Sequence, residues 1–560
     1  MTLPFEDARF DALKKLAAAR FGKVKPAEEK VLSRSASAED QPPDKVTDRP
    51  VVRADFLRWL ATDKGASESI DPLGLRVHNA TIPSGLDLDF CKMSFPLRFL
   101  NCALQGNLSL RSSQLRALEL AGCTAEKDVV ADGLRTQRGI SFRNLRAKGT
   151  IRLLGARIDG GIDCGGAALE STGDSFNADE ARITGSVLLR DGFSSKGTIS
   201  LALAQIGSIL TCPGATLSAT GDALNAYGAK IAGGVFLRDG FSSSGTIRFP
   251  LAQIGGDLDC SGADRFGTIM CDKMRVEGRM IYTDIAHPEN SELRLSGATV
   301  GELHDDRKSW PSKGNLHLDG FVYKDLILRE RAAPKQVQTY QLGTSLGLDS
   351  DTRIEWLNRQ PDQELVNAQP WMQLVGLLEA RGNSRGAKHV RYEYDRQRAK
   401  AGNWYLRPFS WVYDQIEEQP LRISVPILGL WAVGSLVFWR AARIRAMTPT
   451  DREKHWRAKE ADAAHRHQPP FNPAIYALEN VLPVVRLGQD NAWAPDPDAP
   501  PGTWLPQSER IRKFFNNWAF TRWLACLDYR RLAFTRWALI LLGWVLALIL
   551  AAAISGSFKP

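Results

Sequence analysis

Three acidic side chains are the first candidates for chemistry, because they recur in similar glycine-rich, alternating segments. Asp163, Asp257 and Asp259 each lie next to an apolar residue in such a segment. Carboxylates at these positions could line a groove, as they do in carbohydrate-cleaving β-helices. Solvated strand positions explain the same pattern more simply, so we predict no catalytic residue among them.

Histidines and cysteines are the residues that could bind a metal. His465 and His467, with His455 nearby, could do so weakly, but histidines in a flexible loop explain this spacing better. The eight cysteines include no CxxC pair, so they fit neither a zinc site nor a disulfide framework. We therefore predict no metal and expect reduced, buried cysteines.

Three of the cysteines share one spacing. Cys164, Cys212 and Cys260 are 48 residues apart. In a repeat protein this spacing gives them equivalent positions about 10 Å apart, which is too far for a disulfide. We expect them to form a ladder of small, inward-facing residues.

The sequence contains no cofactor or nucleophile motif in the required context. Dinucleotide-binding glycines, a P-loop, HExxH and a nucleophile elbow are all missing. The glycines of the segment GARIDGGIDCGG recur with the repeat, which is typical of turns. We predict neither a catalytic site nor a bound cofactor.

The elements that position these residues come from an internal repeat. The 33 residues that begin at Ile183 recur 48 residues later, from Ile231, with most positions identical. Within each copy the phrase Ala-x-Ile recurs at intervals of 25 and 23 residues. It occurs at Ala156–Ile158, Ala181–Ile183, Ala204–Ile206, Ala229–Ile231 and Ala252–Ile254.

A period in the twenties with apolar alternation and no helix-length segment is typical of a β-solenoid. We predict a mainly β fold, with a right-handed parallel β-helix of about ten coils over residues 75–328, roughly 50 Å long. Residues 1–74 are expected to form a helical N-terminal cap with a flexible segment, and Val52–Ala61 one of its helices. Residues 329–420 are expected to form a helical hairpin that closes the other end.

Two apolar segments predict a membrane anchor. Ile423–Trp439 and Trp537–Ile554 contain no charge, and tryptophans gather at their ends. We predict transmembrane helices over residues 421–442 and 534–556. Between them, a basic, Trp-rich loop over 443–533 is expected to include an interfacial helix.

The charges around the two spans conflict with the start of the chain. Arginines flank the loop side of both spans, so the positive-inside rule would place the loop in the cytoplasm and the solenoid outside. The N-terminus lacks a signal peptide, and the rule weakens for so long a loop. We therefore expect the solenoid to be cytoplasmic. The arginines concerned are Arg440, Arg443, Arg445, Arg530, Arg531 and Arg536.

One stretch of the connecting loop could form a pore helix. Phe471–Leu487 is semi-apolar and lies between the two spans, as a pore helix does in a two-span channel. No TxGYG filter follows it, and Pro483 interrupts it, so we favour an interfacial segment.

Several motifs resemble one family of bacterial proteins. VVRADFLRWLATD, the Ala-x-Ile coils, DTRIEWLNR and QPWMQLVGLLEARGNSRGAKHV, with a two-span C-terminus, resemble proteins labelled membrane-associated oxidoreductase. The pattern of their repeats is similar to that of pentapeptide-repeat proteins. The resemblance covers nearly the whole chain and implies an oxidoreductase, without a catalytic motif that assigns residues.

The sequence favours a membrane-anchored scaffold or sensor of the bacterial inner membrane, whose rod binds a protein partner. The alternatives are the oxidoreductase and a subunit of a pore-forming homo-oligomer. The net charge of +9 is spread over 560 residues, so we predict no nucleic-acid partner.

Overall fold

The computed structural model divides the chain into two compact units, residues 1–401 and 402–560, which we describe separately. The structure describes residues 4–39, 49–329, 349–401, 424–450, 470–482, 486–498, 502–503 and 526–555. Predictions that fall on the remaining residues lie outside this description.

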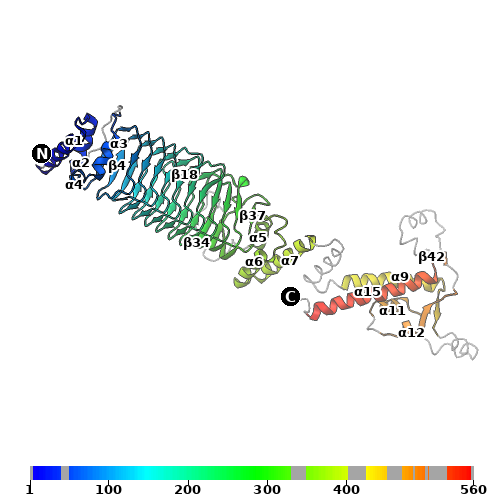
Figure 1. Cartoon of the computed structure of the whole chain (residues 1–560). Helices are drawn as coiled ribbons and strands as arrows, with labels where there is room; N and C mark the ends of the chain where they lie inside the picture. The colour runs from blue at the N-terminus through cyan, green and yellow to red at the C-terminus, as the bar shows by residue number, and fades with distance from the viewer. Residues whose placement is uncertain are drawn as a thin grey trace, which may run out of the picture. The chain divides into compact units, whose positions relative to one another are not determined.

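The first unit is built on a parallel β-solenoid (Figure 1). It begins at β1 (Leu75–His78) and ends with β38 (Val322–Leu328), as predicted. Its longest sheet has 19 strands, and two narrower sheets have 11 and 8 strands. The 11-stranded sheet runs from β3 (Leu86–Asp87) to β37 (Leu316–His317), with one strand per turn. The solenoid therefore has about 11 turns, and its right-handed sense stays a prediction.

Most turns place two short strands in the 19-stranded sheet. The first strands of successive turns are β7 (Gln114–Leu115), β11 (Arg135–Thr136), β15 (Arg157–Ile158), β19 (Arg182–Ile183), β23 (Gln205–Ile206), β27 (Lys230–Ile231) and β31 (Gln253–Ile254). The second strands are β8 (Leu118–Ala121), β12 (Ile140–Ser141), β16 (Ile162–Asp163), β20 (Val187–Leu188), β24 (Leu210–Thr211), β28 (Val235–Phe236) and β32 (Leu258–Asp259).

Longer strands combine the two positions at the C-terminal end of the solenoid. At the C-terminal end, β34 (Arg275–Tyr282) pairs with β36 (Thr299–Asp305), which pairs with β38. At the N-terminal end, β1 pairs with β4 (Leu97–Leu100), which pairs with β8. The 8-stranded sheet runs from β2 (Thr81–Ile82) to β29 (Ser242–Ser243).

The core follows from the alternation along the first strands, where an exposed residue precedes a buried one. Ile158, Ile183, Ile206, Ile231 and Ile254 are register partners on successive turns, and all are buried. Stacking identical branched side chains removes apolar area from water on every turn, which contributes about 25 cal/mol per Å². The repeat that predicted the solenoid is therefore the repeat of its core.

Four helices cover the N-terminal end: α1 (Pro4–Phe21), α2 (Pro26–Ala36), α3 (Ala54–Thr62) and α4 (Lys64–Glu68). The predicted helix at Val52–Ala61 is confirmed as α3. The flexible segment expected within residues 1–74 does not include residues 26–36, because α2 extends to Ala36. The buried Glu28 of α2 forms an ion pair with Arg53, 2.7 Å away, which fixes α2 beside α3.

Three helices follow the solenoid: α5 (Ser350–Leu357), α6 (Ala368–Ala380) and α7 (Ser384–Ala401). The last two form the predicted hairpin. Its apolar face is buried as expected, with Trp371, Leu374 and Val390 fully inaccessible.

The helix α5 is joined to the last turns by a buried ion pair. The Arg353 guanidinium donates to both carboxylate oxygens of Asp305, at 2.8 and 3.0 Å. The indole of Trp310 donates to the same carboxylate. These contacts make α5 part of the C-terminal cap.

Among the described residues of the second unit, three helices pack together: α9 (Ser424–Arg443), α11 (Pro473–Val481) and α15 (Tyr529–Ser555). It also contains α12 (Gln489–Ala492) and two short pairs, β39 (Met447–Pro449) with β40 (Trp493–Pro495) and β41 (Gly502–Thr503) with β42 (Cys526–Leu527). The predicted pore-helix stretch contains α11, which packs against α9 and α15.

Glycines bring these helices close together. A Cβ on Gly434 would lie 2.8 Å from Leu539, and a Cβ on Gly543 would lie 2.1 Å from the Val481 carbonyl oxygen. Small residues at helix contacts are common in membrane proteins, where close backbone approach replaces the hydrophobic effect.

One helix among the described residues is long and apolar enough to cross a membrane, over Val425–Arg443. Only 28% of it is buried, which is unlike the core helix of a soluble protein. The prediction of two transmembrane helices is therefore not confirmed, and one candidate span is present among the described residues. In α15 three arginines precede the apolar stretch, which continues past Ala547, the last of its residues with a described side chain.

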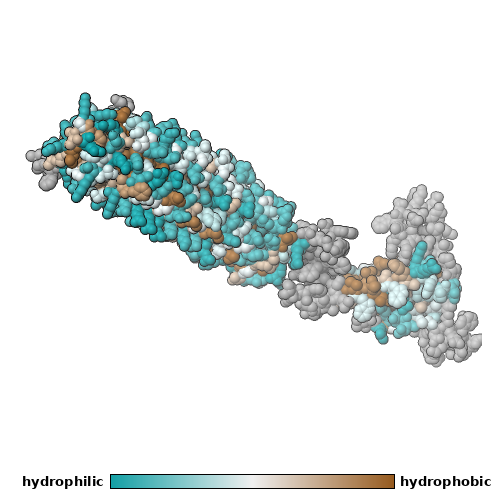
Figure 2. All heavy atoms as spheres, viewed as in Figure 1, coloured by the Kyte–Doolittle hydropathy of each residue, from teal (hydrophilic) through white to brown (hydrophobic). Residues whose placement is uncertain are grey.

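The predicted interfacial helix, from Arg510 to Arg536, lies largely outside the described residues. Its last part is not a separate helix, because Tyr529–Arg536 forms the first turns of α15. Figure 2 shows that apolar residues gather on the surface of α9 and α15, whereas the visible face of the solenoid is mostly hydrophilic.

Candidate functional site

The three aspartates considered for catalysis lie on the second strands of the 19-stranded sheet or just before one. Asp163 contacts Arg143 at 3.2 Å, Asp257 contacts Arg279 at 2.6 Å, and Asp259 contacts Arg238 at 3.2 Å. Four turns, about 19 Å, separate Asp163 from Asp259 along the ladder. Asp163 is therefore too far from Asp259 to form a pair with it for acid–base catalysis, and an arginine contacts each of the three carboxylates.

The ion pair at Asp257 changes its pKa. Burial alone would raise this pKa, but hydrogen bonds from the Arg279 side chain and backbone outweigh this effect. The pKa of Asp257 is lowered as a result, so the carboxylate stays ionised to a lower pH than an ordinary aspartate does.

The predicted cysteine ladder is confirmed. The register carries Cys164 through Leu189 to Cys212, and through Leu237 to Cys260, so the cysteines are two turns apart. All three are buried and unpaired. Burial raises the pKa of Cys212 to about 12 and that of Cys164 further, so neither is a reactive thiol.

The histidines considered as weak metal ligands, His455, His465 and His467, lie outside the described residues. Within the described ranges, no three His, Cys, Asp or Glu side chains are grouped so that they could hold a metal ion.

A different set of residues forms the most distinctive surface of the solenoid. Nine outward-facing positions follow one another along the first strands, one per turn, and we call them the basic row. Six are Lys or Arg, three are Gln, and none is acidic. The basic row consists of Lys92, Gln114, Arg135, Arg157, Arg182, Gln205, Lys230, Gln253 and Arg275.

The cations of the basic row differ from the arginines of the neighbouring second strands. None of the six forms an ion pair within the described part of the chain, and all are exposed. On the neighbouring second strands, which we call the paired face, arginines lie 2.6–3.2 Å from carboxylates. The pairs there are Arg98–Glu119, Arg143–Asp163, Arg238–Asp259 and Arg279–Asp257.

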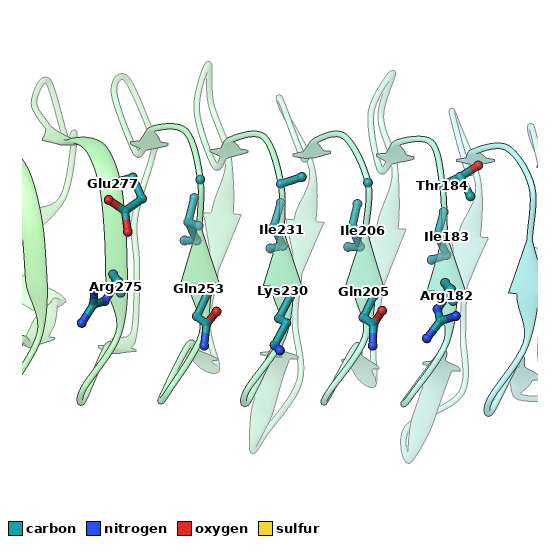
Figure 3. A pocket seen from close by; sticks show the side chains of 14 residues that line it. Arg182, Ile183, Thr184, Gln205, Ile206, Lys230, Ile231, Gln253, Arg275 and Glu277 are labelled. Atoms are coloured by element: carbon teal, nitrogen blue, oxygen red, sulfur yellow. The ribbon is translucent and has the colours of Figure 1, made fainter.

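A hollow of about 530 Å³ follows the C-terminal half of the basic row, and we call it the axial groove. Figure 3 shows its wall, a line of five row side chains from Arg182 to Arg275, one from each turn. The outward position two residues later in each of the three middle turns carries a small residue. These residues, Gly207, Ala232 and Gly255, form the floor of the axial groove. Thr184 and Glu277 lie at the two ends of that floor.

The N-terminal half of the row has a different profile. A second hollow, of about 500 Å³, includes Lys92, Gln114 and Arg135. Arg116 and Gln137 occupy two of the positions equivalent to the floor of the axial groove, and both are larger than the glycine or alanine found there. Only the axial groove therefore combines a wall of cations and amides with a floor of small residues.

The sequence contained a signal for the basic row that our reasoning did not use. The row occupies the middle position of each Ala-x-Ile phrase, where Arg157, Arg182, Gln205, Lys230 and Gln253 stand. The alanine and isoleucine identified the core, and the variable residue between them identifies the surface.

No protein-family model matches the chain, and no curated protein or solved structure is significantly similar to it. The resemblance to proteins labelled membrane-associated oxidoreductase therefore gains no support from these comparisons. The similarity to the repeats of pentapeptide-repeat proteins also gains no support. The features that bear on function are the surface of the solenoid and the apolar helices of the second unit.

Proposed function

We propose that this chain is a membrane-tethered scaffold that binds an acidic protein partner through the basic row. The observation that carries the proposal is the set of six exposed cations without an ion pair among the described residues. Like charges on neighbouring strands repel one another and destabilise a sheet. A row of them is explained when an external anionic partner neutralises it.

The second unit supports the tether. On α9, Val425 is 65% exposed and Leu428 is 55% exposed, and on α15 Trp537 is 70% exposed. Large apolar side chains that remain in water are unfavourable, whereas a bilayer would cover them. We propose that α9 and α15 both cross the membrane as a hairpin, packed through Gly434 and Gly543.

We further propose the bacterial inner membrane as the location, with the solenoid in the cytoplasm. Protease added to inverted membrane vesicles should then digest the solenoid, while right-side-out vesicles protect it. Alkaline carbonate should leave the full chain in the membrane pellet. Release of the chain into the supernatant would contradict the tether.

The oxidoreductase and pore alternatives remain predictions, since no observation on the described residues favours either. A row-bound partner is the hypothesis that the surface chemistry supports best.

Site-specific photo-crosslinking of the full chain in its native membranes tests the role of the row. The crosslinker replaces Gln114 or Gln205 in the basic row and, as the control, the exposed Thr216 on the 8-stranded sheet. We expect a protein adduct from both row positions and none from position 216. Replacing the six row cations by glutamine should reduce the adduct at least tenfold.

Equal adducts from both faces, an adduct that survives removal of the six cations, or no row adduct at all would each overturn the proposal. Glutamine is a suitable replacement because it already occupies three positions of the row. Circular dichroism of the purified variant confirms that the solenoid is intact.

A further inference from the structure

The cations of the axial groove have a regular spacing. Along its wall, charged and amide side chains alternate in the order Arg182, Gln205, Lys230, Gln253, Arg275. Neighbouring turns of stacked strands are about 4.8 Å apart, so the three cations recur at about 9.6 Å. A ligand that engages all three must repeat its negative charge at this distance.

Among extended peptide conformations, polyproline II matches this repeat. It has three residues per turn and a rise of about 3.1 Å, so every third side chain lies on one face, about 9.3 Å apart. In a β-strand the side chains of one face recur at about 6.8 Å, which loses register within the groove. We propose that the axial groove binds a polyproline II segment of the acidic partner, with an acidic residue at every third position.

The other side chains of the groove suit the same ligand. A polyproline II backbone makes no internal hydrogen bonds, so its carbonyl groups are free to accept. The side-chain amides of Gln205 and Gln253 lie between the cations and can donate to such carbonyls. Gly207, Ala232 and Gly255 leave room for proline rings beside the wall.

Other anionic ligands fit the groove less well. Single-stranded nucleic acid binds on aromatic side chains that stack with its bases, and the lining of the groove contains none. A bilayer surface is flat and would not enter a recessed floor.

The test uses the full chain in detergent and two labelled peptides of identical composition and charge. In Asp-Pro-Pro-Asp-Pro-Pro-Asp the acids have the spacing of the groove, and in Asp-Asp-Asp-Pro-Pro-Pro-Pro they are clustered. We expect the spaced peptide to bind at least tenfold more tightly in fluorescence anisotropy at low salt. Equal affinities would show that charge alone matters and would overturn the inference.

Two triple variants locate the binding. Arg182→Gln, Lys230→Gln and Arg275→Gln together remove the groove cations, and we expect at least a tenfold loss of affinity for the spaced peptide. Lys92→Gln, Arg135→Gln and Arg157→Gln remove the same charge from the same row outside the groove. This control should lose less than threefold, and equal losses in both variants would contradict a groove site.

This inference rests on the proposed function, but the two can fail separately. If the spaced peptide has no preference while the row adducts persist in membranes, the polyproline II ligand is wrong and the scaffold proposal stands. If the row adducts are missing as well, both are wrong.

Discussion

The basic row and the C-terminal cap both depend on arginine, but they use it in opposite ways. In the row, Arg157 and Arg182 are exposed on adjacent turns without an ion pair among the described residues. In the cap, Arg353 is buried and donates two hydrogen bonds to the buried Asp305. The paired face is intermediate, with partly exposed arginines beside carboxylates.

The two regions differ in what compensates the charge of each guanidinium, a carboxylate in the cap and water in the row. A buried guanidinium is tolerated only when a carboxylate compensates its lost hydration, so Arg353 has a structural role. An exposed guanidinium is hydrated and needs no internal partner, so the row can remain available for an external ligand. Substitutions in the two regions should therefore have different consequences, and the following predictions begin with the largest expected effect.

The largest effect is expected in the cap. Arg353→Met leaves the Asp305 carboxylate buried with only the Trp310 indole as a side-chain donor, and should cost about 3–5 kcal/mol of stability. Hydrogen exchange of α5 and β36 measures this loss locally in the full chain. A loss below about 1 kcal/mol would show that the pair is not truly buried.

A double variant separates the effect of an unpaired buried charge from the effect of lost packing. Adding Asp305→Leu to Arg353→Met removes the unpaired charge and should recover a large part of the stability, because an apolar replacement of a buried pair is often nearly neutral. No recovery would indicate that the lost packing around Arg353 dominates.

A smaller effect is expected when the axial groove is filled. Ala232→Trp adds an indole to the exposed floor and should weaken binding of the spaced peptide about tenfold, or about 1.4 kcal/mol. The unfolding free energy should change by less than about 0.5 kcal/mol, as is usual for a surface position. Unchanged peptide affinity would place the ligand elsewhere on the row.

The regular parts of this molecule could be predicted from its sequence, whereas the long-range contacts could not. The Ala-x-Ile phrase repeats in five successive turns, so the burial of residues such as Ala156 and Ile158 follows from a local pattern. The helix α2 was missed because its position depends on the pair of Glu28 with Arg53, 25 residues away in the chain. The residues of the basic row are far apart in the sequence, and they form a line only because the turns stack.

The aspartates illustrate the same limit. Asp163 and Asp259 occupy similar sequence contexts, but the interpretation as solvated strand positions is wrong for Asp259, which is buried beside an arginine. Their arginine partners lie on adjacent turns, at Arg143 and Arg238, and nothing in the local sequence indicates which arginine each one meets.

The paired face should show a pH-dependent contribution of at most about 1 kcal/mol. The folded state lowers the pKa of Asp257 below its unfolded value of about 3.9, despite the opposing effect of burial. The stabilisation is therefore present above about pH 4 and is lost as the pH falls through the folded pKa. Asp257→Asn should flatten the stability profile in this acidic range, and Arg279→Gln should remove the same contribution.

The smallest effect is expected in the row itself, and its sign is opposite. Arg135, Arg157 and Arg182 stand on three consecutive turns, about 4.8 Å apart, so their charges repel. Arg157→Gln should therefore stabilise the chain by a few tenths of a kcal/mol at low salt, and screening should abolish the gain at high salt.

Arg275→Gln is the matched control, because its row neighbours are Gln253 and Thr299, and it should give no such gain. Chemical denaturation of the full chain at two salt concentrations measures both variants. If Arg157→Gln instead destabilises the chain at every salt concentration, the arginine has a structural role and the contrast with the cap disappears. A gain confined to low salt would mean that the stacked charges lower stability, as expected for a surface shaped by binding.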